Sequence, residues 1–232
     1  MHYCWLMGQQ IWPRMMATAR EGLVTHIGRT ALELAAEHGL AGTSMSQLAK
    51  AAGVARATLY KYFPDVESAI VAYLSAEVDR YRDALTTALA GVGDPFRRLD
   101  LYIDHQIEYL NSPAHRSGAS QIEAAGLSAA AFARYEAHVA AVRGLVEELL
   151  RDGINTGAFR ADLDAGLHTT FLLHLMNGAR VALDRDGIAP HRVSAALKDL
   201  VRRGLLSDSR KPATGSGARR RPAAGKLIEP PS

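Results

Sequence analysis

The chain has 232 residues, of which 48% are hydrophobic and 22% are charged, and its formal net charge is +3 at pH 7. This composition is typical of a globular protein of one or two domains and argues against a largely disordered chain. No run of eighteen apolar residues occurs, so we expect no membrane span. The single cysteine, Cys4, excludes an internal disulfide and favours a reducing compartment such as the cytoplasm.

The first segment of the chain gives little structural signal. Residues 1–19 have no helical stripe of useful length, which predicts a disordered arm, or an artefact of start assignment with Met15 or Met16 as the true start. From about Arg20 to His38 the apolar residues recur at helical spacing, and a glycine then ends the predicted helix.

Two short helical patterns follow, joined by a tight turn. Ser44 and Gln47 have the spacing of a capping box, which predicts a helix that starts at Met45. Gly53 can take the left-handed conformation at little cost and ends this helix, and a second helix with a basic, hydroxyl-rich outer side follows at once. A helix–turn–helix of this kind places side chains in the major groove of DNA.

The stretch from Ala49 to Phe63 reads AxxAGVxxxTLYxYF and resembles the operator-reading motif of the tetracycline-repressor (TetR) family. The resemblance implies an all-α protein with two domains. Residues 20–65 would form an N-terminal three-helix, helix-turn-helix DNA-binding domain. Residues 66–206 would form a C-terminal helical bundle for ligand binding and dimerisation.

The rest of the chain predicts helices alone, because no apolar–polar alternation of strand length appears. We expect these helices over roughly 66–90, 95–111, 120–125, 128–154, 163–185 and 190–206. Residues 207–232 are rich in Pro, Gly, Ser and Arg, which predicts a disordered basic tail. Such a tail could grip DNA phosphates, but we favour the simpler interpretation of a solubilising end.

The resemblance assigns the DNA contacts residue by residue. Base-facing positions would be held by Ser46, Arg56, Ala57, Thr58 and Lys61, and phosphates would be contacted by Thr43, Tyr60 and Tyr62. The chemistry agrees, because Arg and Lys suit guanine, a methyl group suits thymine and a phenol donates to phosphate. The sequence departs from the family at Ala55, where a serine cap is usual, and at Val66, where many members have a phosphate-binding lysine.

A few polar or aromatic side chains of the second domain fall on the apolar side of their predicted helices. They are Gln106, Tyr135, His138, His168 and Phe171. Pockets between bundle helices are apolar with a few placed polar groups, so these residues could line a site for a small, largely apolar effector. The alternative is that each is a core residue with a satisfied hydrogen bond.

The last two predicted helices carry more apolar surface than one bundle needs. Their apolar residues include Leu175, Leu183, Val193, Leu197, Leu200 and Val201. The resemblance implies that this helix pair forms a four-helix dimer interface with its copy; the alternative is a purely internal core. The nine histidines form no HxxxH, HExxH or Cys/His cluster, so we expect no metal and no cofactor.

Together these patterns favour a homodimeric repressor that binds a palindromic DNA operator and releases it when an effector binds. One alternative is a dimeric DNA-binding regulator that responds to no small molecule. The other is an α-helical enzyme with Asp104 and His105, or Tyr135 and His138, as an acid–base pair. No nucleophile elbow, phosphate loop or metal signature supports an enzyme.

Overall fold

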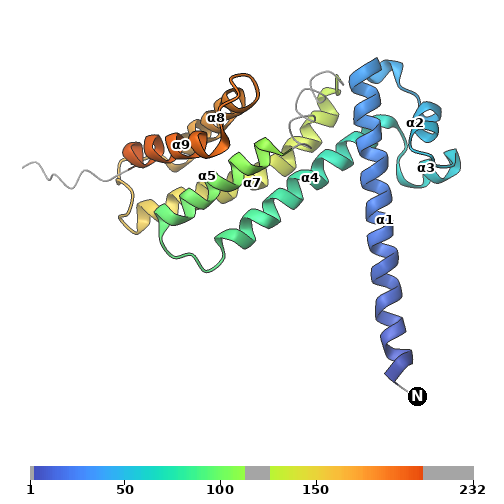
Figure 1. Cartoon of the computed structure of the whole chain (residues 1–232), viewed down its shortest axis with the longest axis horizontal. Coiled ribbons are helices and arrows are strands. Elements are labelled where there is room, and N and C mark those ends of the chain that lie inside the picture. Colours follow the sequence, from blue (N-terminus) through green and yellow to red (C-terminus); the bar gives the residue numbers. More distant parts are fainter. Residues whose placement is uncertain (1–2, 113–125, 206–232) are drawn as a thin grey trace, which may run out of the picture.

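The computed structural model describes residues 3–112 and 126–205, and all regular structure within these ranges is helical. Its elements are α1 (Tyr3–His38), the short 3-10 helix η1 (Leu40–Gly42), α2 (Met45–Ala51), α3 (Arg56–Tyr62), α4 (Val66–Leu89), α5 (Pro95–Asn111), α7 (Ala129–Asn155), α8 (Ala165–Asp184) and α9 (Pro190–Leu205). The molecule is elongated, with α1–α3 at one end and α8 and α9 toward the other (Figure 1). The all-α fold expected from the sequence is therefore confirmed.

The N-terminal segment differs from its prediction. α1 begins at Tyr3 rather than near Arg20, so the stretch expected to be a disordered arm continues the helix and projects past the other elements (Figure 1). Its Leu, Met, Gln and Ala residues are good helix formers, and extending an existing helix requires no new nucleus. The predicted helix at 120–125 and the predicted tail at 207–232 lie outside the described residues.

Local hydrogen bonds set the boundaries of the short helices as predicted. The Ser44 hydroxyl accepts from the Gln47 backbone N at 3.3 Å, and the Gln47 side-chain oxygen accepts from the Ser44 backbone N at 2.8 Å. Gly53, in the turn between α2 and α3, has a φ of +64°, which is the left-handed conformation. The Asp65 carboxylate caps α4 by accepting from the Ser68 backbone N at 2.7 Å. These contacts fix the path of the chain from α2 into α4.

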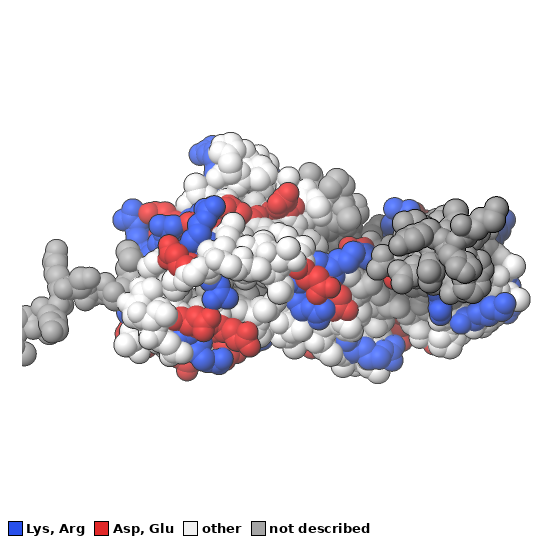
Figure 2. All heavy atoms as spheres, turned by 90° about the horizontal axis from the view of Figure 1, so that it is seen from below, with Lys and Arg blue, Asp and Glu red and all other residues white. Residues whose placement is uncertain are grey.

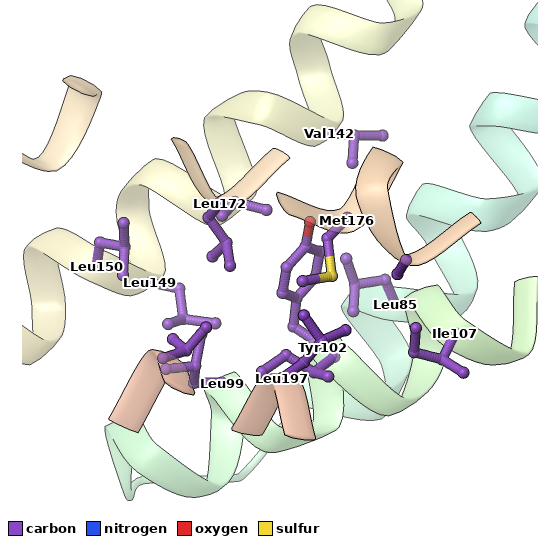
Figure 3. Packing of buried hydrophobic residues seen from close by; sticks show 14 of the residues in the cluster. Leu85, Leu99, Tyr102, Ile107, Val142, Leu149, Leu150, Leu172, Met176 and Leu197 are labelled. Atoms are coloured by element: carbon purple, nitrogen blue, oxygen red, sulfur yellow. The ribbon is translucent and has the colours of Figure 1, made fainter. Parts of the chain in front are cut away.

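Two hydrophobic clusters form the interior. The head core joins α1, α2 and α3 to the first half of α4, including Ile27, Leu48, Leu59, Ile70 and Tyr73. The bundle core joins the second half of α4 to α5, α7, α8 and α9, including Leu85, Tyr102, Leu149, Met176 and Leu197 (Figure 3). The two cores meet within α4, between Leu74 and Val78, and not at its first residue, where the sequence suggested a domain boundary.

A glycine allows α1 to lie directly on α4. A Cβ at Gly28 would come within 2.5 Å of the Tyr73 Cβ and 2.7 Å of the Ala69 carbonyl oxygen. The two helices can therefore pack this closely only because residue 28 has no side chain. This contact holds the head core against the helix that continues into the bundle.

Replacing this glycine tests the contact. Gly28→Ala should lower the free energy of unfolding by ~1–3 kcal/mol, because the added methyl group overpacks the helix crossing. The control is Gly22→Ala on the same helix, where a Cβ meets no atom within 4 Å. It should raise stability by ~0.5–1 kcal/mol through helix propensity alone. Urea denaturation measures both, and equal effects from the two variants would contradict the close α1–α4 packing.

Candidate nucleic-acid interface and ligand sites

The outer side of α3 carries the predicted DNA-reading residues. Leu59 is fully buried and anchors the helix, whereas Arg56, Ala57 and Lys61 are exposed and Tyr60 is 47% exposed. Ser46, on α2, is also exposed. Residues 43–63 contain three basic residues and no acidic residue. Lys and Arg side chains mark this end of the molecule in Figure 2.

Arg56 and Tyr60 form a pair on the exposed side of α3, one helical turn apart. The Arg56 guanidinium carbon lies 5.6 Å from the centre of the Tyr60 ring, and a guanidinium nitrogen donates to the phenol oxygen at 3.4 Å. Both side chains are exposed, so this cation–π contact is weak enough to open for a base or phosphate. Thr58, also predicted to face DNA, is half-buried beside them.

The predicted phosphate-contacting residues at the edges of the motif have protein partners. Thr43 donates its hydroxyl proton to the Gly39 carbonyl oxygen at 3.0 Å, which leaves only its lone pairs free. The Tyr62 ring is half-buried, and the Arg20 guanidinium carbon lies 5.6 Å from its centre. Arg20 has no sequence signal for this place, because only the fold brings α1 close to Tyr62.

The start of α3 lacks a side-chain cap. Ala55 occupies the N-cap position with an extended backbone and makes no capping hydrogen bond. The departure from the family noted in the sequence therefore has a structural counterpart. Replacing an N-cap Ser by Ala typically costs ~1 kcal/mol of helix stability, so α3 depends on tertiary packing through Leu59.

The five predicted ligand-site residues are not gathered in one place. Gln106 is half-buried and accepts a hydrogen bond from the Tyr81 hydroxyl, and Tyr135 packs against both cores. His138 lies between α7 and α4, where its Nδ1 is 3.1 Å from the Asp79 carboxylate. His168 and Phe171 lie on α8 and line a hollow on the outer side of the bundle.

Two hydroxyl groups in the bundle core were missed by the sequence analysis. Tyr102 and Thr169 are both fully buried, and neither hydroxyl has a hydrogen-bond partner among the described residues. The Tyr102 ring extends from α5 toward Leu172 and Met176 of α8 (Figure 3). Burial raises the pKa of Tyr102 well above the ordinary value of a phenol, so its proton is retained and available to donate. No sequence pattern indicates that a buried hydroxyl lacks a partner.

The predicted dimer residues divide into a buried and an exposed set. Leu183, Val193, Leu197 and Val201 are buried in the subunit's own core, and Leu175 is half-buried. Leu200 of α9 is 57% exposed, and Leu167, Phe171 and Val181 of α8 are also exposed; we call these four residues the α8–α9 patch. An apolar hollow of about 370 Å³ opens on this patch, lined in part by Phe171, Leu175 and Leu200.

The acid–base pairs considered for an enzyme have structural partners. Asp104 accepts from the Ser194 hydroxyl at 2.6 Å and pairs with Lys198, so it joins α5 to α9. Partial burial raises the pKa of Asp104, but the hydrogen bonds from Lys198 and Ser194 outweigh it and hold the pKa below the usual value.

Within the described ranges no group of three His, Cys, Asp or Glu side chains could hold a metal ion, and no helix could span a membrane.

Sequence comparisons identify the N-terminal part of the chain. Residues 27–68 match the family described as "Bacterial regulatory proteins, tetR family". An uncharacterized HTH-type transcriptional regulator of Mycobacterium tuberculosis is 41% identical over 59 residues, which make up 25% of this chain. This match spans 29% of the length of that relative.

Solved structures extend the likeness to the whole described fold. The fatty acid degradation regulator FadR of Bacillus halodurans superposes with a TM-score of 0.66 at 23% identity, covering 81% of this chain and 96% of that one. FadR of Bacillus subtilis in complex with stearoyl-CoA gives 0.67 at 19% identity, over 78% and 98% of the two chains. A transcriptional regulator of Saccharomonospora viridis in complex with choline superposes with a TM-score of 0.64 at 21% identity, covering 81% of this chain and 99% of that one. Residues 27–68 are therefore similar to the tetR family of bacterial regulatory proteins, and the all-α fold of the chain is shared with solved regulators.

Proposed function

We propose that this protein is a sequence-specific, DNA-binding transcriptional repressor that acts as a homodimer in the cytoplasm. The observation that carries the proposal is the geometry of α2 and α3. A buried Leu59 turns Arg56, Ala57 and Lys61 outward together, within a stretch, residues 43–63, that has no acidic residue. Side chains of this kind on an exposed second helix can reach base edges in the major groove.

Two copies would pair through the α8–α9 patch. Four large apolar side chains are exposed there, each between 45% and 58%, and two of them, Phe171 and Leu200, line an apolar hollow. Surface of this kind is stabilised when a second copy covers it. A two-fold pair of heads would read a palindromic operator, with each α3 in a successive major groove.

The bundle core would receive the effector. Two buried hydroxyls without partners, Tyr102 and Thr169, are costly in an apolar interior, and a ligand with a hydrogen-bonding group would satisfy them. Related folds have been solved with stearoyl-CoA and with choline, which supports a small-molecule effector. Binding would favour a position of α4 in which the two heads are wrongly spaced for DNA. The alternative, a regulator with no effector, leaves these hydroxyls unexplained.

The first prediction concerns the DNA face. Lys61→Ala should weaken operator binding by ~1–3 kcal/mol and relax the preference at one base pair per half-site, because it removes a base contact. Tyr62→Phe should instead weaken binding to all sequences alike, since a phosphate contact carries no sequence information. Fluorescence anisotropy with operator and random duplexes separates the two effects. Parental affinity for both duplexes in both variants would rule out this face.

The second prediction concerns assembly. Leu200→Glu should give a folded monomer with weakened operator binding, because a carboxylate buried in an apolar interface is strongly unfavourable. The control is Ala84→Glu, an apolar-to-acidic change at an exposed position of α4. It should remain dimeric. Sedimentation velocity and circular dichroism give mass and folding, and a dimeric Leu200→Glu variant would exclude the α8–α9 patch as the interface.

The third prediction concerns the effector. Tyr102→Phe should leave the free protein as stable as the parent or raise its stability by ~1 kcal/mol, because it removes a buried hydroxyl without a partner. It should also reduce the stabilisation by any effector that uses this hydroxyl. The control is Tyr81→Phe, which removes a satisfied hydrogen bond to Gln106 and should destabilise the free protein. Thermal unfolding with and without a library of apolar ligands measures the stability of the free protein and the stabilisation by an effector. Equal destabilisation of the free protein by the two changes would contradict an unpaired Tyr102 hydroxyl that is open to a ligand.

A further inference from the structure

A second pocket lies between α4 and α7, separate from the two unpartnered hydroxyls of the bundle core. Its α4 wall is made by Ser68, Val71, Ala72 and Ser75, and its α7 wall by Arg134 and His138. The spacing of these residues places each set on one face of its helix. The pocket has a volume of about 360 Å³. It lies along the seam where α4 and α7 run side by side (Figure 1).

The hydrogen-bonding groups of this pocket have few partners in the protein. Ser75 is only 8% exposed, and its hydroxyl makes no hydrogen bond within the described part of the chain. The Ser68 hydroxyl is likewise unpaired among these residues, and the exposed Arg134 guanidinium contacts no described carboxylate. Both hydroxyls line the pocket without a described protein partner, so they are available to donate to a ligand bound there.

His138 is oriented by a carboxylate on α4. Both Asp79 oxygens lie 3.1 Å from Nδ1, so Asp79 accepts the Nδ1 proton and leaves Nε2 as the free ring nitrogen. Asp79 also pairs with Arg82 at 3.1 Å. Arg82 also pairs with Asp83, so it offsets the Asp79 charge only in part, whereas Arg134 adds a positive charge with no described counterion.

This set of groups fits an anion. A guanidinium and two hydroxyls can all donate to the same ligand, and a carboxylate or phosphate group offers several acceptor oxygens. The apolar side chains of Val71 and Ala72 beside them suit the organic part of a molecule. We propose that the pocket between α4 and α7 binds the carboxylate or phosphate group of a small organic anion, with Arg134, Ser68 and Ser75 as donors.

The position of the pocket gives it a regulatory role, which rests on the proposed function. Toward the head, the Glu67 carboxylate accepts from the Ser128 backbone N at 2.7 Å and from its hydroxyl at 3.0 Å, which ties the start of α4 to the start of α7. Toward the bundle, Asp79 and His138 join the same two helices. An anion bound between these two links would hold α4 against α7 and fix the orientation of the head.

Calorimetry on the full-length protein, without DNA, tests the site. The probes are inorganic phosphate, phenyl phosphate and benzoate, which separate a free phosphate from an organic phosphate and an organic carboxylate. We expect saturable binding of at least one probe. Arg134→Gln should weaken it by ~10-fold or more, the factor for losing one charge-assisted hydrogen bond. Ser75→Ala should also weaken binding without lowering the thermal stability of the free protein.

The matched control is Arg143→Gln, another exposed α7 arginine, which donates to Thr170 and lies outside the pocket. It should bind the probe like the parent. No saturable binding of any probe, or an affinity unchanged by Arg134→Gln, would overturn the site.

DNA binding is measured separately, on duplexes selected by the protein from a random pool. A bound probe should change the affinity for the selected duplex, and an unchanged affinity would overturn the regulatory role. Failure to select any duplex would refute the proposed function and leave the calorimetric result standing.

Discussion

A single uninterrupted helix, α4, supplies buried side chains to both hydrophobic cores, and the relative position of the head and the bundle depends on it. Ile70 and Tyr73 lie in the head core, and Leu85 and Leu89 lie in the bundle core of the same helix. A helix packed at both ends transmits a shift of one end to the other, because its backbone hydrogen bonds resist bending. Any ligand that displaces α4 within the bundle therefore also displaces the predicted DNA-reading surface.

The parts of this structure that the sequence predicts well depend on contacts between residues close in the chain. The cap formed by Ser44 and Gln47, the left-handed Gly53 and the cap formed by Asp65 each need three residues or fewer to close. The outward side of α3 follows from the burial of Leu59, which the helical period already implies. For these reasons the exposed side of α3 could be predicted from sequence, whereas the length of α1 could not, because residues 3–19 have no apolar stripe.

The remaining features depend on which helices become neighbours, and periodicity carries no such information. The Glu67–Ser128 and Asp79–His138 contacts join residues 61 and 59 positions apart. Leu197 and Leu200 belong to the same helix, yet the first is 7% exposed and the second 57%. The packing of α9 against α5 and α8 distinguishes them. The predicted ligand residues were dispersed for the same reason, since facing an apolar side does not determine which cavity a side chain reaches.

The burial of Leu183, Val193, Leu197 and Val201 within one subunit has a consequence for assembly. Each chain buries these side chains in its own core, so the proposed pairing through the α8–α9 patch would be a concentration-dependent step separate from folding. Newly made and existing subunits can then exchange without unfolding. While free subunits predominate, the concentration of the proposed pair would rise with the square of the subunit concentration.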